Sequence, residues 1–168
     1  MACSQTLAGI VRDCSTNMGG IKTVYIANQA DVDSVTVTSG VVTAITMNAS
    51  KKFYKYAFAL GTSSLTSNWQ VSPENGTRYV ETDLLMVFNR MDSTKRLEIM
   101  ALAQAELAVI VEDNNGNLWY LGNDEPVVLN AGDGQTGTAR GDRNGYSITL
   151  RETSSELPLP CTATPPTA

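Results

Sequence analysis

The sequence predicts a mainly β (α+β) fold, a β-sandwich or β-barrel with one packed amphipathic helix at about residues 93–106. Short runs rich in valine, threonine and aromatic residues alternate with small polar turn residues along most of the chain, as in strands. Two Asn-Gly pairs separate apolar runs, as in tight hairpins. Only residues 93–106 have the apolar spacing of a helix. We expect residues 83–122, which hold the densest apolar runs, to be the central packing unit.

The first part of the chain is expected to form strands and turns. Residues 21–28 alternate well enough for one strand, and residues 31–48 contain two strands that meet at a Ser-Gly turn. Residues 51–60 begin with alternating polar and aromatic residues, which is typical of a half-buried strand. Residues 61–67 are small and polar, and we expect a loop or a flexible strand end there.

A long hairpin is expected to lead into the central unit. Residues 68–71 and 78–88 are strand-like, and Asn75 and Gly76 lie between them. Asparagine and glycine both tolerate the positive φ angles of a tight turn. The inferred hairpin therefore spans about residues 65–89.

The predicted helix begins near Asp92 or Ser93, because either side chain can accept hydrogen bonds from free N–H groups of the first turn. An apolar face follows at the spacing i, i+3, i+4 and i+7. Its members are Leu97, Met100, Ala101 and Gln104, and the face is widened by Ile99, Leu102, Ala103 and Leu107.

After the helix, residues 108–113 and 118–122 are expected to form a second hairpin around the Asn-Gly turn at 114–117. Residues 125–130 read as a strand that leads into a glycine-rich loop. Residues 144–152 are the last convincing strand.

Residues 1–157 are expected to form a single β-rich domain, and residues 158–168 a proline-rich C-terminal arm or disordered tail. Near the beginning of the chain, Leu7, Ile10 and Val11 have the spacing of one helical turn. The three cysteines form no metal-binding pattern, and we expect reduced thiols, with a Cys3–Cys14 disulfide as the alternative.

Composition argues against several classes of function. The chain of 168 residues has a formal net charge of −5, so it lacks the clustered basic residues that grip phosphates. It contains no histidine, which removes the commonest general base, the histidine-dependent triads and most zinc sites. We therefore expect no enzyme activity, no cofactor and no metal. The most apolar run, residues 107–111, is too short to cross a bilayer, and we expect no membrane partner.

Several short motifs match functional patterns by letter only. Residues 132–137 fit G-x-G-x-x-G, but no helical pattern follows, and a dinucleotide site requires that helix. Residues 140–142 spell the cell-adhesion tripeptide Arg-Gly-Asp, which we attribute to chance. Asp113, Asn115 and Asn117 alternate as calcium ligands do, but the glycine is misplaced and no glutamate closes the loop, so a hairpin turn is expected.

The remaining polar and aromatic candidates are expected to be structural. The paired carboxylates lie in turns or at strand ends, where solvated surface is the usual role; they are Asp31/Asp33, Glu112/Asp113 and Asp124/Glu125. Trp69, Trp119 and Tyr120 are interpreted as core or interface residues. The alternative is a monomeric β-sandwich binding module, for carbohydrate or a host surface, that uses Trp69 or Trp119.

The second half of the chain has a distinctive order of motifs: a helix, the hairpin V-I-V-E-D-x-N-G-x-x-W-x-L-G, a glycine-rich loop with T-G-T, and the final D-x-N-G-Y-x-I-T-L. In this order it resembles tail tube-like and tail and neck ring structural proteins of tailed bacteriophages. Residues 7–28 are also similar to small virion proteins from phages of Bacteroidota, the crAss-like phages among them.

This resemblance implies a virion protein that is made in the host cytoplasm and joins copies of itself into closed rings. The expected ring order is six, with twelve as the alternative, and the partners are other phage tail or neck proteins. DNA would pass through the channel without specific binding, which suits an acidic chain. The channel-facing or ring-stacking candidates are the polar residues of the long hairpin, Glu74, Asn75, Thr77 and Arg78.

Overall fold

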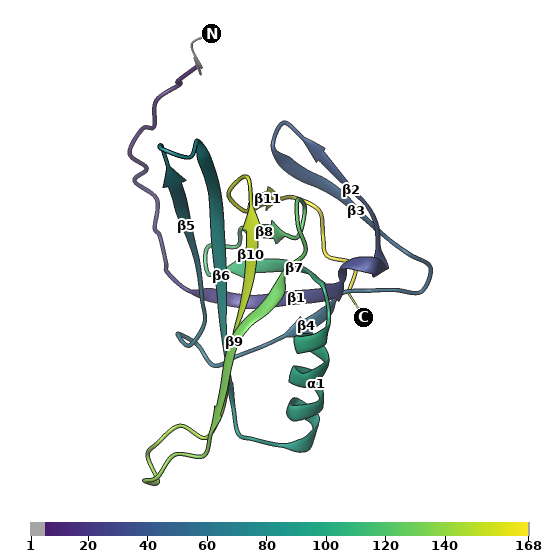
Figure 1. The fold of residues 1–168 in the computed structure, drawn as a ribbon, viewed down its shortest axis with the longest axis vertical. Helices are drawn as coiled ribbons and strands as arrows, with labels where there is room; N and C mark the ends of the chain where they lie inside the picture. The colour runs from purple at the N-terminus through teal and green to yellow at the C-terminus, as the bar shows by residue number, and fades with distance from the viewer. Residues whose placement is uncertain (1–5, 168) are drawn as a thin grey trace.

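The computed structural model describes residues 6–167 and arranges them as two β-sheets with one α-helix (Figure 1). The predicted mainly β fold with a single helix is confirmed. In chain order the elements are β1 (Ile21–Asn28), the 3-10 turn η1 (Gln29–Asp31), β2 (Val32–Thr38), β3 (Val41–Met47), β4 (Tyr54–Tyr56), β5 (Ser64–Ser72), β6 (Thr77–Asn89), α1 (Ser93–Gln104), β7 (Leu107–Asp113), β8 (Leu118–Leu121), β9 (Val128–Gln135), β10 (Gly145–Ser154) and β11 (Leu159–Cys161).

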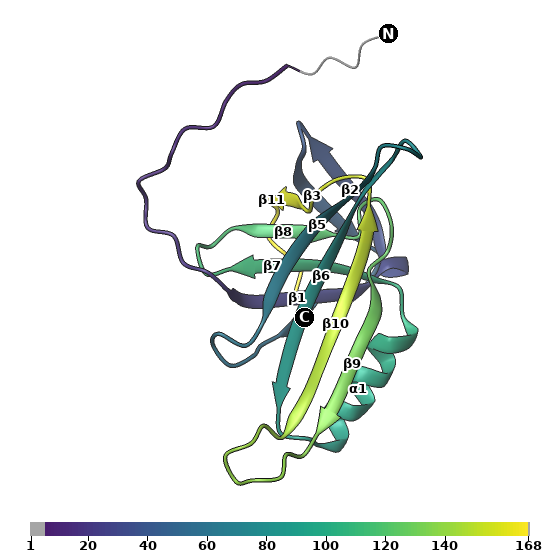
Figure 2. The same cartoon turned by 60° about the vertical axis from the view of Figure 1, so that its left-hand side comes forward.

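The two sheets pack face to face as a sandwich. The seven-stranded sheet has the order β2-β3-β11-β8-β7-β1-β4, and the four-stranded sheet has the order β5-β6-β10-β9. Their strands cross steeply, with β6 and β10 upright and β1 and β7 horizontal in the view of Figure 1. Helix α1 lies beside β9 and closes that side of the sandwich (Figure 2). No helix in the described part of the chain is long and apolar enough to cross a membrane.

The position of β7 between two cores explains why its sequence is apolar without alternation. Leu107, Val109 and Val111 point into the core between the two sheets, whereas Ala108 and Ile110 belong to a second core on the opposite face of the seven-stranded sheet. A strand that is buried on both faces has no polar side. The first core also takes up Leu102 of α1.

Both predicted Asn-Gly hairpins are present. Strands β5 and β6 pair antiparallel up to the turn at Gly76, and β7 and β8 do so around Gly116. The two glycines have φ angles of +67° and +85°, which a residue with a Cβ adopts at a cost. Strand β5 begins at Ser64, so the predicted loop at 61–67 is shorter than expected.

Two predicted strand boundaries are wrong. Only Tyr54–Tyr56 of the expected strand at 51–60 is a strand. Strand β9 begins at Val128 and continues to Gln135, so much of the predicted glycine-rich loop is part of a strand. The glycines belong there because β9 lies close to side chains of β10: a Cβ on Gly134 would lie 2.9 Å from the ring of Tyr146.

Helix α1 begins where predicted, but it buries only part of the predicted apolar face. It ends at Gln104, and Leu102 is buried while Ile99 packs against the core. Leu97 and Met100 are 64% and 49% exposed, so the expectation that they face the core is wrong. Because α1 lies at the side of the sandwich, only a narrow strip of its surface meets the sheets.

The N-cap of α1 allows a direct test of the helix start. A side-chain oxygen of Asp92 accepts a hydrogen bond from the Lys95 backbone N–H at 2.8 Å. We expect Asp92→Ala to lower the free energy of unfolding by about 1 kcal/mol, because one N–H of the first turn loses its partner. Urea unfolding measures the change. Ser93→Ala, one residue later, is the control; an equal loss there would contradict the assignment of Asp92 as the cap.

The C-terminal residues correct a further prediction, that of a proline-rich arm or disordered tail. Residues 158–167 are neither an arm nor disordered, because β11 inserts between β3 and β8. Leu159 and Cys161 are buried in the second core. The Phe53 N–H donates to the Pro166 carbonyl at 2.8 Å, which holds the following residues on the domain. Pro160, between these two residues, is exposed.

The N-terminal residues correct the expectation of a helical turn. Leu7, Ile10 and Val11 form no helical turn; residues 6–20 are irregular and lead away from the domain (Figures 1 and 2). Cys14 is exposed, and its alternative disulfide partner, Cys3, lies outside the described residues.

Candidate functional site

The four-stranded sheet has one apolar and one polar face. Alternation along β6 and β10 turns Val80, Leu84, Ile148 and Leu150 into the core between the sheets. The opposite side is called the outer sheet face here, and its side chains are exposed or half-buried. Its polar members are Thr66, Asn68 and Gln70 of β5, Glu81 and Asp83 of β6, Ser147, Thr149, Arg151 and Thr153 of β10, and Asp133 of β9. The same face also carries Tyr79, Leu85 and Val87 of β6.

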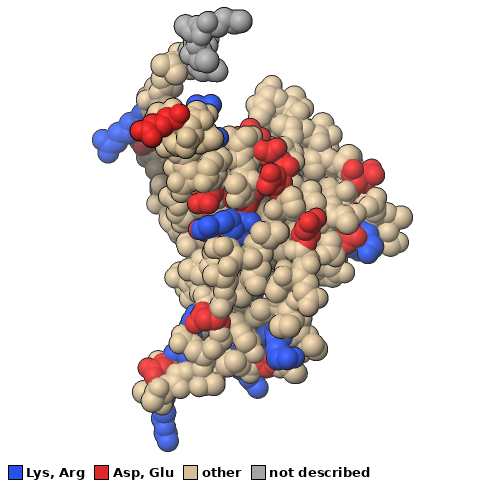
Figure 3. Space-filling view, viewed as in Figure 1, with Lys and Arg blue, Asp and Glu red and all other residues tan. Residues whose placement is uncertain are grey.

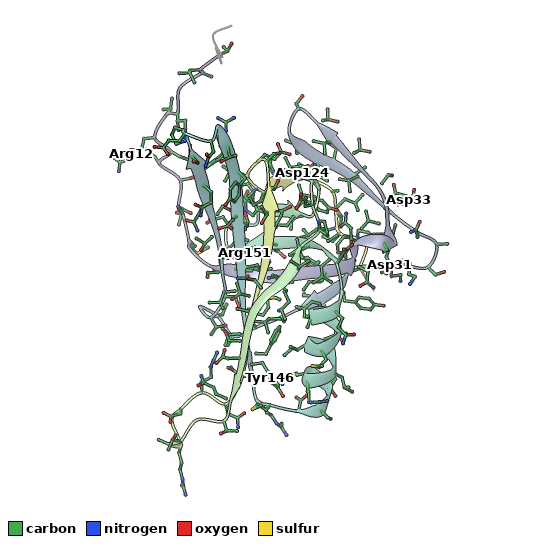
Figure 4. All side chains as sticks on the ribbon, viewed as in Figure 1. Arg12, Asp31, Asp33, Asp124, Tyr146 and Arg151 are labelled. Atoms are coloured by element: carbon green, nitrogen blue, oxygen red, sulfur yellow. The ribbon has the colours of Figure 1, made fainter. Side chains whose placement is uncertain are left out.

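The charges on the outer sheet face are few and mostly acidic. Arg151 donates two hydrogen bonds to the carboxylate of Asp83, both of 2.7 Å, and lies 3.7 Å from a carboxylate oxygen of Glu81. These bonds hold the pKa of Asp83 below its ordinary value and raise the pKa of Arg151 further. Figure 4 places Arg151 midway along the sheet.

The cationic group of Arg151 is thus committed to carboxylates of its own sheet. On β9, Asp133 is paired in the same way with Arg143 at 3.2 Å. Neutral residues cover most of the view in Figure 3, between small groups of mixed charge. Such a surface has no free cluster of positive charge with which to bind phosphates.

The hairpin residues singled out in the sequence lie together at one end of this sheet. Glu74 and Asn75 form the turn, Thr77 and Arg78 begin β6, and all four are exposed. The β5–β6 hairpin extends past β7 and β8 of the opposing sheet (Figures 1 and 2). Thr77 occupies an outer-face register position, whereas Arg78 is on the other side of the hairpin.

The two tryptophans lie in different sheets and have different surroundings. Trp69 of β5 is 48% exposed, and the guanidinium of Arg78 lies 5.8 Å from the centre of its ring, covering one face. Trp119 of β8 is half-buried against the first core, and its Nε1–H donates to Asp113 at 3.3 Å. Of the two tryptophans, only Trp69 presents a largely accessible ring.

The carboxylate pairs are used in local structure. Asp31 is paired with Lys51 at 3.3 Å, and Glu112 with Lys22 at 2.7 Å. Asp124 accepts a hydrogen bond from the Ser155 N–H at 3.0 Å. Among residues 6–167, no group of three or more histidine, cysteine, aspartate or glutamate side chains is arranged to hold a metal ion.

Asp113 organises the second hairpin turn, as the sequence predicted. Its carboxylate accepts hydrogen bonds from the backbone N–H groups of Asn115 and Asn117 at 2.9 and 2.8 Å. Although burial acts to raise it, the pKa of Asp113 is below its ordinary value because of the hydrogen bonds from Asn117, Trp119 and Asn115. The alternating polar residues therefore stabilise a turn.

The other two letter motifs are also structural. Residues 132 and 134 lie within β9, and no helix follows it before β10. Asp142 of the Arg-Gly-Asp tripeptide accepts hydrogen bonds from the backbone N–H groups of Thr138 and Ala139 at 2.8 and 2.7 Å, so it closes its own loop.

One buried charged residue, Glu152, was not predicted from the sequence. Glu152 is only 3% exposed and lies between the sheets, where its carboxylate accepts a hydrogen bond from the Gly122 N–H at 2.7 Å. Burial raises the pKa of Glu152 to about 7, although the bond from Gly122 acts to lower it. Burial also raises the pKa of Tyr120 to about 12, with a further contribution from Glu152. The alternation Ile148, Leu150, Glu152 was the signal that could have revealed this inward position.

The candidate site is thus the outer sheet face together with the tip of the β5–β6 hairpin. It is a long, mostly polar surface of hydroxyl, amide and paired charged groups, with Tyr79, Leu85 and Val87 among them. No family model matches this chain, and neither a curated protein nor a solved structure is significantly similar to it.

Proposed function

We propose that this protein is a non-enzymatic virion structural protein of a tailed bacteriophage, a tail tube or tail/neck ring subunit whose copies form a ring around a channel for DNA. The observation that carries the proposal is the outer sheet face, which continues across all four strands and lacks free positive charge. The resemblance of the C-terminal half to tail and neck proteins supplies the class of particle.

One edge of the four-stranded sheet supports ring formation. Strands β5 and β9 are at the edges; β5 contains neither a charged residue nor a proline, whereas β9 contains Asp133. Edge strands of monomeric proteins usually carry such residues, because they prevent pairing with another chain. If β5 of one copy pairs with β9 of the next, the contact is head-to-tail and closes into a ring at a fixed rotation.

The outer sheet faces would then line the channel. A DNA conduit must not hold its cargo, since each phosphate neutralised by a cation adds salt-dependent affinity. Glu81, Asp83 and Asp133 would repel phosphates. The guanidinium of Arg151 is paired with Asp83 and Glu81. The proposed ring order is six, with twelve as the alternative, and the ring contacts other tail or neck proteins.

Particle imaging tests the proposal directly. Purified protein is examined by mass photometry and negative-stain microscopy over a wide range of concentration, alone and with the tail and neck proteins of the same phage. Closed rings with a central opening are the expected result. A protein that stays monomeric under all of these conditions would contradict the proposal.

Charge reversal at the hairpin tip separates assembly from folding. Because Glu74 is exposed in a turn, Glu74→Lys should change the free energy of unfolding by less than about 0.5 kcal/mol. We expect it to alter ring stacking or DNA passage, which are followed by microscopy and by DNA ejection from assembled particles. Glu106→Lys, an exposed glutamate after α1, is the control. Equal effects of the two variants on assembly would argue against a role for the tip.

Trp69 supports a second candidate, a monomeric β-sandwich module that binds carbohydrate or a host surface. Its indole is about half exposed, and one ring face is free of Arg78. Titration of tryptophan fluorescence with a glycan panel, using Trp69→Ala as control, tests this candidate. An unchanged signal with every glycan would eliminate it.

A further inference from the structure

The N-terminal arm, residues 6–16, leaves the domain from a fixed base. The turn between β7 and β8 holds the residues just after it: the Asn114 side-chain amide donates to the Gly19 carbonyl at 2.7 Å, and the Met18 N–H donates to Asn115 Oδ1 at 2.8 Å. The side-chain amide of Asn115 also donates to Asn17 Oδ1 at 2.9 Å. These bonds set the direction in which the arm departs.

The N-terminal arm carries an apolar patch without a partner. Leu7, Ile10 and Val11 are 90%, 102% and 92% exposed. A single exposed aliphatic side chain is ordinary, but three within five residues form a patch of the kind found at interaction sites. The spacing i, i+3, i+4 also lets the three side chains share one side of a helical turn once a partner surface is present.

A second uncovered apolar surface lies on helix α1. Its outer stripe consists of Leu97, Met100 and Ala101, followed by the polar Gln104, all exposed. The sequence pattern assigned this stripe to the core together with Ile99 and Leu102, and only the latter two meet the core. Positions i, i+3, i+4 and i+7 form a continuous strip, the usual form of a helix surface that packs on another segment.

The two surfaces lie on different sides of the molecule. In Figures 1 and 2 the N-terminal arm is on the left and α1 on the right. The base of the arm is next to β5, because Met18 and Gly20 share a hollow with Ser64 and Leu65. Helix α1 lies beside β9, at the other edge of the same sheet.

We propose that the N-terminal arm of one copy packs on the outer stripe of α1 in the next copy of this chain. Two different uncovered patches on separate sides of a molecule fit a head-to-tail contact between copies. The inference rests on the proposed ring: pairing of β5 with a neighbour's β9 brings the arm of one copy to the junction that holds α1 of the other. Each surface carries exposed charges of both signs, Arg12 and Asp13 on the arm and Arg96 and Glu98 beside the stripe.

A peptide-binding experiment tests the contact without requiring a ring. The probe is a fluorescent peptide of residues 6–16, and the receptor is the full chain with Leu7→Ser, Ile10→Ser and Val11→Ser, so that its own arm does not compete. The peptide should bind, and adding Leu97→Ser and Met100→Ser to the receptor should weaken binding about tenfold or more, because two apolar side chains lose their burial. Leu60→Ser, at an 86% exposed leucine outside the stripe, is the control and should leave binding unchanged.

Absence of binding, or equal binding to the receptor with and without the stripe substitutions, would overturn the proposal. Thermal unfolding of each receptor variant confirms that the domain is intact, which is expected because every substituted residue is exposed.

Self-association of the unlabelled full chain provides the second readout. Mass photometry should show that the arm substitutions and the stripe substitutions each shift the assembled protein toward monomers. Rings that form equally well with both sets of substitutions would contradict the arm contact and leave the proposed ring standing. Peptide binding by a chain that never forms rings would contradict the proposed ring and leave the arm contact standing. A wild-type chain that stays monomeric while its arm is protected from proteolysis would show that the arm folds onto its own domain, and would also overturn the proposal.

Discussion

Replacement of Glu152 by glutamine is expected to remove most of the loss of stability that the wild-type protein shows as the pH rises from about 4.5 to about 7. The carboxyl group lies between the two sheets, 3% exposed, and its identified partner is the Gly122 N–H at 2.7 Å. The side-chain amide of glutamine retains an oxygen for this bond and has no charge to bury. Its stability should therefore vary little across this range of pH.

The direction of the effect follows from the sign of the shift. Burial raises the pKa of Glu152 from 4.5 to about 7, and the nearby carboxylates of Asp124 and Glu156 act in the same direction. Below pH 4.5 both the folded and the unfolded chain hold the proton, and the stability is fully present. Between the two pKa values only the unfolded chain releases it, so stability falls as the pH rises. Once the pH exceeds the pKa of the folded protein, the total loss in the free energy of unfolding is about 3 kcal/mol.

Urea unfolding at a series of pH values measures this loss in the wild type and in Glu152→Gln. The aspartates whose pKa is lowered in the folded protein, such as Asp83 and Asp113, act in the opposite sense and at lower pH, below their ordinary value of 3.8. The difference between the two proteins therefore isolates Glu152. Glu125→Gln, at an exposed carboxyl near the same loop, is the matched control. Parallel pH curves for wild type and Glu152→Gln would show that the buried carboxyl does not titrate in this range.

Truncation of Leu159 to alanine is expected to lower the free energy of unfolding by about 3 kcal/mol. The side chain is 6% exposed and packs in the second core with Val42, Phe53 and Tyr120. Its strand is the connection between β3 and β8, so a cavity here loosens the attachment of the β2–β3 hairpin to the rest of the sheet. A loss of this size is a large part of the stability of an ordinary domain.

Leu157 provides the control for this prediction, since the same residue type two positions earlier is 47% exposed. Leu157→Ala should cost less than about 1 kcal/mol. Both variants are compared by urea unfolding, with the slope of the transition checked against the wild type. Equal costs for Leu157→Ala and Leu159→Ala would mean that β11 does not hold its place in the sheet in solution.

Much of the local structure could be predicted from the sequence. The hairpin turns at Gly76 and Gly116 and the helix start at Asp92 are where the sequence predicts them. In each case the signal and the structure lie within four residues of one another: a side chain closes its own turn or caps its own helix. The long hairpin of the candidate site was located in the same way.

The outer sheet face itself was beyond prediction, because register decides which side chains share a face. The pairing of Arg151 with Asp83 joins residues 68 positions apart, and it depends on the alignment of β10 with β6. A shift of one residue would exchange the two faces. Composition indicates an acidic chain but cannot place the carboxylates beside one arginine.

The sequence by itself therefore determined the local elements: most of the strands, two turns, the helix start and the mainly β fold class. Tertiary structure alone decided that β11 enters a sheet rather than forming an arm, that α1 leaves Leu97 and Met100 exposed, and that Glu152 is buried. The physical reason is the same for all three. A turn or cap is stabilised by neighbours along the chain, whereas burial depends on partners such as Val42 for Cys161, which come from distant positions only after the sheets have formed.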